Sequence, residues 1–161
     1  MAVTRKVSVE RNRLRFAAAH MATFHGECEP LHGHNYDVSL EVEGALTEDA
    51  WVWDFGDLKR TMRGLCEQLD HKFLLQRQST MLAIEEQAAH WSVAFGDKSY
   101  LFPKADVAVL PIPNTTAEQI AEWMGGFVIA ELKRLGATNI VRVTIGVEEM
   151  PGQAGWYTVD V

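Results

Sequence analysis

Three histidines near the start of the sequence are of a type and spacing that could bind a metal ion. His32 and His34 flank Gly33, and His20 precedes them. Zinc prefers neutral imidazole nitrogens, and a catalytic zinc site keeps three protein ligands and one open position. Residues i and i+2 of a strand project from the same face, so His32 and His34 can converge on one ion. The sequence therefore predicts a Zn²⁺ site in which His20 is the third ligand.

Cys28 comes shortly before this histidine pair and has two possible roles. It could be the fourth ligand of a closed structural site. Alternatively, its thiolate could lie near Zn²⁺, whose field lowers the pKa of a thiol and makes it a base or nucleophile. His25 and His90 are competing ligands, but structural or surface roles suit them better. Cys66 adjoins an apolar helical stripe and is expected to be a packed small hydrophobe.

Two further groups of residues could take part in chemistry at such a site. Asp70 and His71 adjoin one another, and a carboxylate beside a histidine can orient the ring and raise its basicity. Taken alone, such a pair is more typical of a helix cap or a solvated pair. Glu149 extends the apolar row of a predicted strand to an inward-facing position, where a carboxylate needs hydrogen-bond donors. A ligand with an amidine-like or guanidine-like edge would supply two.

Strands are expected to carry most of these residues. Residues 6–21 alternate in polarity, with Leu14, Phe16, Ala18 and His20 on one face, and residues 32–42 alternate more sharply. Two more strand-like runs, 139–149 and 155–161, end the chain on either side of a PGQAG turn.

Two helices are expected between these strand pairs. The first begins at Asp54 and repeats Leu58, Met62, Leu65 and Leu69 at helical spacing. In the second, Thr115 and Glu118 form a capping box, Gly136 is the stop, and Ile120, Trp123, Phe127 and Leu132 form the apolar face.

Residues 76–113 have no clear period. Within them, TMLAIEEQAAHW is interpreted as a short helix and VAVLPIP as a short strand. The expected class is α+β, with an antiparallel sheet and helices on one face.

The whole chain, residues 1–161, is expected to form one domain. It has 161 residues, of which 47% are hydrophobic, and a formal net charge of −7 with scattered Lys and Arg. These features argue against nucleic-acid or anionic-membrane partners. No signal peptide or membrane-spanning run is evident, and two cysteines do not indicate a disulfide framework, so a cytosolic location is expected.

Six pieces of the sequence, in order, resemble the 6-pyruvoyl-tetrahydropterin synthase and 6-carboxy-tetrahydropterin synthase family. They are FAAAH (16–20), CEPLHGHNY (28–36), WDFGDLK (53–59), LDHKFL (69–74), TAEQIA (116–121) and VEEMP (147–151). The resemblance implies a tunnelling fold of ββααββ type, in which trimers pool their sheets into a barrel and two trimers stack into a homo-hexamer. It implies Zn²⁺ on His20, His32 and His34, and 7,8-dihydroneopterin triphosphate as the substrate.

The resemblance also assigns roles to the other candidates. It implies that Cys28 and the pair Asp70 and His71 transfer protons, that Glu149 anchors the pterin ring, and that Thr116 contributes to substrate binding. The short spacer in CEPLHGH resembles the bacterial 6-carboxy-tetrahydropterin synthases of queuosine biosynthesis, which release acetaldehyde and triphosphate.

Several alternatives stay open. The chain could form a pyruvoyl product, or a hydroxymethyl product, because a related branch uses a glutamate near the position of Glu29. It could also be a non-catalytic pterin-binding protein or a structural zinc protein.

Overall fold

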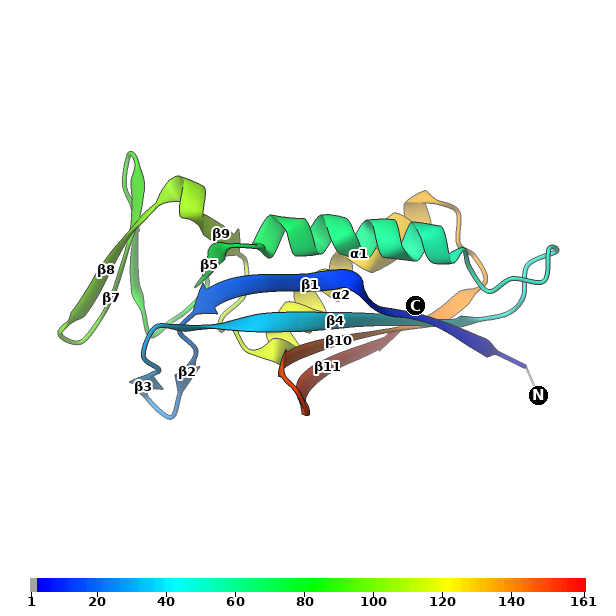
Figure 1. The fold of residues 1–161 in the computed structure, drawn as a ribbon, viewed down its shortest axis with the longest axis horizontal. Coiled ribbons are helices and arrows are strands. Elements are labelled where there is room, and N and C mark those ends of the chain that lie inside the picture. Colours follow the sequence, from blue (N-terminus) through cyan, green and yellow to red (C-terminus); the bar gives the residue numbers. More distant parts are fainter. Residues whose placement is uncertain (1–2) are drawn as a thin grey trace.

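A six-stranded sheet forms the main body of the computed structural model, which describes residues 3–161 (Figure 1). The strand order is β11-β10-β4-β1-β5-β9, and β5 and β9 run parallel to their neighbours while the other pairs are antiparallel. The strands are β1 (Arg5–His20), β4 (His32–Gly44), β5 (Lys72–Gln76), β9 (Val107–Leu110), β10 (Ile140–Met150) and β11 (Gln153–Asp160). The expected α+β class is confirmed.

Alternation along the long strands places one row of side chains in the core. The predicted inward row of β1 is buried from Leu14 to His20, and Tyr36, Val38, Leu40 and Val42 of β4 are all buried. In β10 the predicted row is buried from Val143 to Val147, but Val141 is exposed. The β4–β10 register shifts between Ile140 and Arg142, which brings Ile140 rather than Val141 into the core.

Two helices, α1 (Phe55–Leu69) and α2 (Ala117–Arg134), cover the same face of this sheet (Figure 1). Asp54 caps α1 as predicted, because its carboxylate accepts the Asp57 N–H at 2.9 Å. The stripe from Leu58 to Leu69 and Cys66 are buried in the core. After α2, Gly136 has a φ of +80°, which suits glycine and agrees with the predicted stop.

The start and one side of α2 differ from the sequence prediction. The N-cap is Thr116, whose hydroxyl accepts the Gln119 N–H at 3.3 Å, so the prediction of Thr115 as the cap was wrong by one residue. Thr115 is instead buried and bonded to Gln76. Phe127 was predicted to be in the core but is 48% exposed, because Met124 and Val128 occupy the buried face.

Residues 76–113 contain a second, three-stranded sheet at one end of the molecule (Figure 1). It comprises β6 (Ala83–Glu86), β7 (His90–Phe95) and β8 (Lys98–Pro103), and a short 3-10 helix, η1 (Lys104–Asp106), leads into β9. The prediction of a helix in TMLAIEEQAAHW was therefore wrong, whereas the strand in VAVLPIP is confirmed by β9. Trp91 and Val93 of β7 pack with Phe73 and Leu75 of β5 in a second core.

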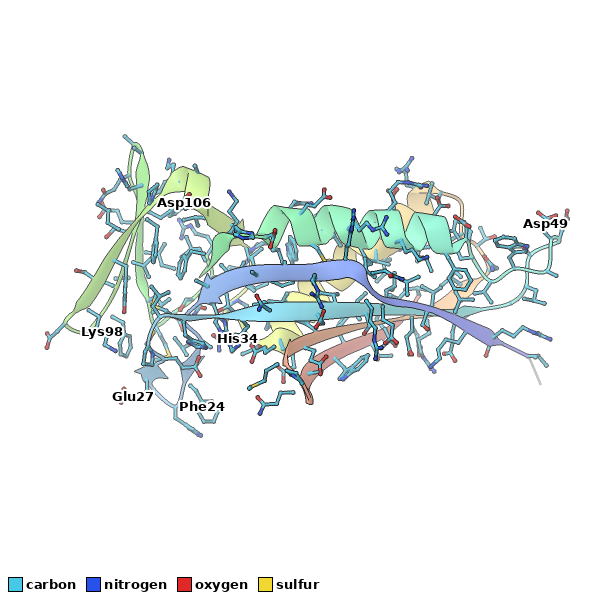
Figure 2. All side chains as sticks on the ribbon, viewed as in Figure 1. Phe24, Glu27, His34, Asp49, Lys98 and Asp106 are labelled. Carbon is cyan, nitrogen blue, oxygen red and sulfur yellow. The ribbon has the colours of Figure 1, made fainter. Side chains whose placement is uncertain are left out.

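A small hairpin of β2 (Thr23–Phe24) and β3 (Glu27–Cys28) lies at this same end. Figure 2 places Phe24 and Glu27 there, together with His34 and Lys98, whereas Asp49 lies at the opposite end. His34, one of the three predicted metal ligands, therefore lies at this end of the molecule. Within residues 3–161, no helix is long and apolar enough to cross a membrane.

Candidate metal centre

The register of β1 and β4 brings the three histidines together. His20 pairs directly with His32 across the two strands, and His34 pairs with Ala18 on the same face. One nitrogen from each of His20, His32 and His34 lies within 4.8 Å of the others. A Cβ at Gly33 would lie 2.9 Å from the Ala18 carbonyl oxygen, so glycine permits the close approach of the two strands. The predicted convergence on one point is confirmed.

Backbone carbonyl groups fix the tautomers of two of these rings. Nδ1 of His20 lies 2.9 Å from the Thr115 carbonyl oxygen, and Nδ1 of His32 lies 2.8 Å from the Pro30 carbonyl oxygen. Because a carbonyl oxygen can only accept, each Nδ1 carries the proton and each Nε2 presents a lone pair. Burial lowers the pKa of His20 to about 4, so this ring is neutral at pH 7.

Two lone pairs then face each other, because the Nε2 atoms of His20 and His32 are 3.2 Å apart. Neutral rings with both protons on Nδ1 cannot hydrogen-bond to each other through Nε2, so a shared proton or a bound metal ion is what makes this contact favourable. Metal-bound histidines commonly donate the other ring N–H to a carbonyl group, as both do here. The donor set and its supporting contacts fit a zinc ion with an open position.

A cavity of about 570 Å³ opens beside the triad. Its lining includes Phe24, Thr116, Glu118 and Glu149. The substrate-binding roles of Glu149 and Thr116 stay predictions. Burial raises the pKa of Glu149, and the nearby His34 opposes that shift. Among the described residues that line this cavity, none is Lys or Arg. The cavity thus offers nitrogen ligands, carboxylates and an aromatic ring, but no cation of its own.

Comparison with known proteins agrees with this combination of fold and site. The family model for 6-pyruvoyl tetrahydropterin synthase matches residues 9–160. A putative 6-carboxy-5,6,7,8-tetrahydropterin synthase of Methanocaldococcus jannaschii is 34% identical over 145 residues, covering 89% of each chain. A probable enzyme of the same name from Halobacterium salinarum is 39% identical over 149 residues, which are 91% of this chain and 85% of that protein.

The chain belongs to the 6-pyruvoyl tetrahydropterin synthase family. A solved structure of the Plasmodium vivax 6-pyruvoyltetrahydropterin synthase matches it with a TM-score of 0.92 and 32% identity, over 99% of this chain and 100% of that one. That protein is a variant in which a glutamate described as a catalytic residue is replaced by alanine.

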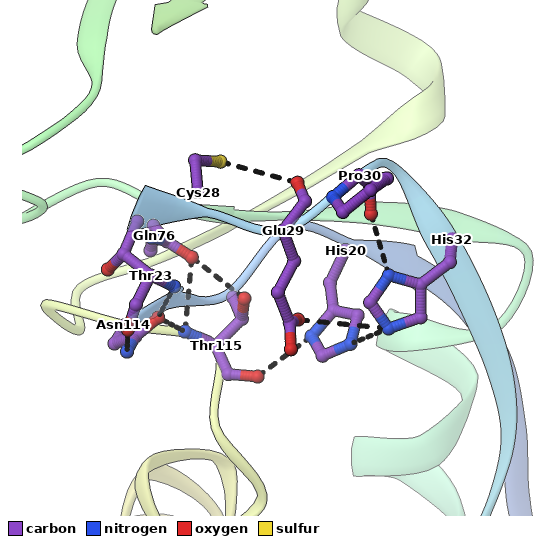
Figure 3. A network of polar contacts seen from close by, with 9 residues as sticks. All are labelled: His20, Thr23, Cys28, Glu29, Pro30, His32, Gln76, Asn114 and Thr115. Atoms are coloured by element: carbon purple, nitrogen blue, oxygen red, sulfur yellow. Dashed lines mark hydrogen bonds and ion pairs between the residues drawn. The ribbon is translucent and has the colours of Figure 1, made fainter. Parts of the chain in front are cut away.

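The side chains of the adjacent residues Cys28 and Glu29 point in different directions. The carboxylate of Glu29 lines the cavity and lies 3.8 Å from His32 Nε2. The Cys28 thiol instead contacts the Glu29 carbonyl oxygen at 3.5 Å (Figure 3). It also packs against the second core. Burial raises the pKa of this thiol, and the nearby Lys98 opposes the shift. The structure therefore places Glu29, rather than Cys28, toward the triad.

Asp70 and His71 form a pair outside this cavity. Asp70 is the C-cap of α1; its Oδ2 lies 2.9 Å from His71 Nδ1, and its Oδ1 accepts the Ala17 N–H at 2.8 Å. The Ala17 N–H, followed by His71, lowers the pKa of the Asp70 carboxyl. The His71 side chain is 83% exposed, so the pair is ordered but directed toward solvent.

Sequence reasoning missed two features of the site. It did not predict that Glu29 faces the triad, and only the family resemblance drew attention to that residue. It also did not predict that Gln76 and Thr115 support His20 from behind. A Gln directly after the apolar run Phe73–Leu75 of KFLLQ was the available signal for the second feature.

Proposed function

We propose that this protein is a zinc-dependent 6-carboxy-5,6,7,8-tetrahydropterin synthase. In this reaction 7,8-dihydroneopterin triphosphate and one water give carboxy-tetrahydropterin, acetaldehyde and triphosphate, as in the biosynthesis of queuosine and related 7-deazapurines. The observation that carries the proposal is the histidine triad facing one cavity with a partly buried carboxylate, Glu149. The names of relatives that match most of the chain support it.

Different residues of the cavity bind the pterin and the metal ion. Glu149 accepts hydrogen bonds from the amidine-like edge of the pterin, which satisfies a carboxylate that burial otherwise disfavours. Thr116 accepts the Gln119 N–H at 3.3 Å, so its own O–H is available to donate into the cavity. His20, His32 and His34 hold Zn²⁺, which when bound acts as a Lewis acid on the hydroxyl groups of the substrate side chain.

Proton transfer is assigned to residues around the substrate side chain. Cys28 has the role that the family resemblance implies for the carboxy product, with Asp70 and His71 as the second pair. Because Asp70 and His71 lie outside the cavity of their own chain, we place them at the site of a neighbouring copy. This arrangement requires at least one neighbouring copy, which the proposed homo-hexamer of two trimers would supply. The neighbouring copy would also supply the Lys or Arg that a triphosphate needs, since this cavity has none of its own.

A second candidate function is favoured by the direction of Glu29. Its carboxylate, not the Cys28 thiol, lies beside His32, and the matching P. vivax synthase has a glutamate described as a catalytic residue. A general base at this position would favour cleavage of the substrate side chain to give hydroxymethyl-dihydropterin.

A product assay distinguishes these functions. The purified protein is loaded with one equivalent of Zn²⁺ and incubated with 7,8-dihydroneopterin triphosphate, and the products are identified by mass spectrometry. Carboxy-tetrahydropterin with acetaldehyde supports the main proposal. Pyruvoyl- or hydroxymethyl-pterin would replace it with another activity of the family, and zinc binding without turnover would favour a binding role.

A further inference from the structure

A buried network of polar side chains lies directly behind the ligand His20 (Figure 3). Gln76, the last residue of β5, is 1% exposed, and Thr115 is 0% exposed. Oε1 of Gln76 accepts the Thr115 backbone N–H at 3.1 Å and the Thr115 hydroxyl at 2.7 Å. The Thr115 carbonyl oxygen in turn lies 2.9 Å from Nδ1 of His20. Three hydrogen bonds therefore connect a strand of the sheet to a metal ligand.

Thr115 needs this support because its backbone belongs to no helix or strand. It lies between β9 and α2, where no regular ladder sets the direction of its carbonyl group. Asn114 Oδ1 also accepts the Thr115 N–H, at 3.0 Å, and Asn114 exchanges two hydrogen bonds with the backbone of Thr23. Side chains, rather than secondary structure, therefore hold the peptide that orients His20.

Gln76 also leaves one polar group unpaired, and this is hard to explain by folding alone. Its Nε2 is buried and has no hydrogen-bond partner among the described residues. The amide cannot be turned over, because the Thr115 N–H is an obligatory donor and must face the oxygen. A buried, unpaired N–H group is destabilising, so an apolar side chain would suit a strand that is otherwise KFLL.

We propose that Gln76 is a positioning residue of the metal centre, which acts through Thr115 to hold His20 with its proton on Nδ1 and its Nε2 free for the metal. The proposal rests on the metal-binding part of the proposed function. Outer partners of this kind commonly change metal affinity 10- to 100-fold when they are removed. Gln76 does not itself line the cavity, so it acts on His20 only through Thr115.

The test compares two substitutions at Gln76 in the full chain. Gln76→Met removes the accepting oxygen at similar size, whereas Gln76→Glu keeps an accepting oxygen and replaces only the unpaired Nε2. Zinc affinity is measured by competition with a chromophoric chelator, and thermal unfolding reports whether each variant folds. Gln68→Met, at an exposed glutamine of α1, is the matched control. We expect Gln76→Met to bind zinc at least about 10-fold more weakly, with Gln76→Glu and Gln68→Met within about threefold of the wild type.

An NMR measurement distinguishes a changed His20 tautomer from a general loss of stability. In imidazole ¹H–¹⁵N spectra of the metal-free protein, the wild type should show His20 with its proton on Nδ1. Gln76→Met should show a mixture of tautomers, and Gln76→Glu should restore the wild-type spectrum. A purely structural role would lower the unfolding temperature without changing the tautomer.

Each outcome decides the matter. Unchanged zinc affinity in a folded Gln76→Met protein overturns this inference but leaves the proposed function standing, whereas a wild type without zinc affinity overturns both. Should Gln76→Met fail to fold, Thr115→Val and Thr115→Ser replace it. The serine keeps the hydroxyl that donates a hydrogen bond to Gln76, so only Thr115→Val should weaken zinc binding. Equal zinc affinities in these two variants would overturn the inference.

Discussion

The Nε2 atoms of His20 and His32 lie 3.2 Å apart across the β1–β4 pair, while a backbone carbonyl oxygen holds the proton of each ring on Nδ1. This arrangement is unfavourable without a cation, so zinc should stabilise the fold as well as bind to it. We expect Zn²⁺ at 100 times its Kd to add about 2.7 kcal/mol to the free energy of unfolding. Differential scanning calorimetry with and without zinc checks this.

Removal of one ligand should abolish that stabilisation. His32→Ala is expected to weaken zinc binding by more than about 100-fold, beyond the loss typical of outer partners. His90→Ala, in β7, lies outside the triad and should bind zinc like the wild type. Chelator competition gives the affinities, and equal binding by the two variants would show that the metal lies elsewhere.

The turn that carries Cys28 and Glu29 should control which product forms. Cys28→Ala is expected to keep zinc and lose at least about 100-fold of carboxy-tetrahydropterin formation, the scale of a lost proton-transfer group. Glu29→Gln, which removes the carboxylate 3.8 Å from His32, should instead suppress any hydroxymethyl product by a similar factor. Product ratios by mass spectrometry distinguish the two effects, and identical losses in both variants would refute separate roles.

Gly33 should tolerate no side chain, because a Cβ there would lie 2.9 Å from the Ala18 carbonyl oxygen. Gly33→Ala is expected to cost about 1–3 kcal/mol of stability through overpacking between β1 and β4. Gly64→Ala is the matched control, since a Cβ at that helical position meets nothing within 4 Å. It should stabilise the protein by about 0.4–1 kcal/mol. Urea unfolding measures both, and a neutral Gly33→Ala would mean that the strands can separate at this point.

The Asp70 carboxylate should make stability depend on pH. The Ala17 N–H and His71 lower its pKa in the folded state, so its stabilising effect is present above the ordinary value of about 3.9 and is lost as pH falls through the folded pKa. Asp70→Asn should therefore lose about 1 kcal/mol at pH 7, a modest figure because the group is partly exposed.

Unfolding at pH 7, 5 and 3 provides the measurement for Asp70. The difference from the wild type should shrink below about pH 4, where the carboxyl begins to be protonated in the unfolded state, and disappear as pH falls through the lowered pKa of the folded state. Asp49→Asn, in a loop at the opposite end of the molecule, controls for the loss of one charge. A difference that stays constant across this range would show that the Ala17 contact does not depend on the carboxylate charge.

The faces on which the three histidines lie could be predicted from strand alternation, whereas their meeting at one point depends on the register of β1 and β4. His20 lies on the buried row of β1, and His32 and His34 lie on the inward parity of β4, so a period of two fixes their common face. Glu149 follows from the same rule applied to β10. The pairing of β1, β4 and β10 then brings these faces together.

Other features depend on tertiary contacts that local patterns do not reveal. Residues 80–91 are rich in helix-favouring Ala, Leu, Glu and Gln, yet pairing between β6 and β7 overrides that propensity. The Thr115 side chain is of a type that caps helices, but its hydroxyl is hydrogen-bonded to Gln76, and Thr116 caps α2 instead. The opposite directions of Cys28 and Glu29 arise in a short hairpin without a periodic signal.

X-ray absorption spectroscopy at the zinc edge tests the central claim, an open zinc centre on His20, His32 and His34, most directly. The zinc-loaded protein should show nitrogen and oxygen scatterers at about 2.0–2.1 Å, with the signature of three imidazole rings and no sulfur. A sulfur scatterer at about 2.3 Å would contradict the account, because it would make Cys28 a ligand and close the site.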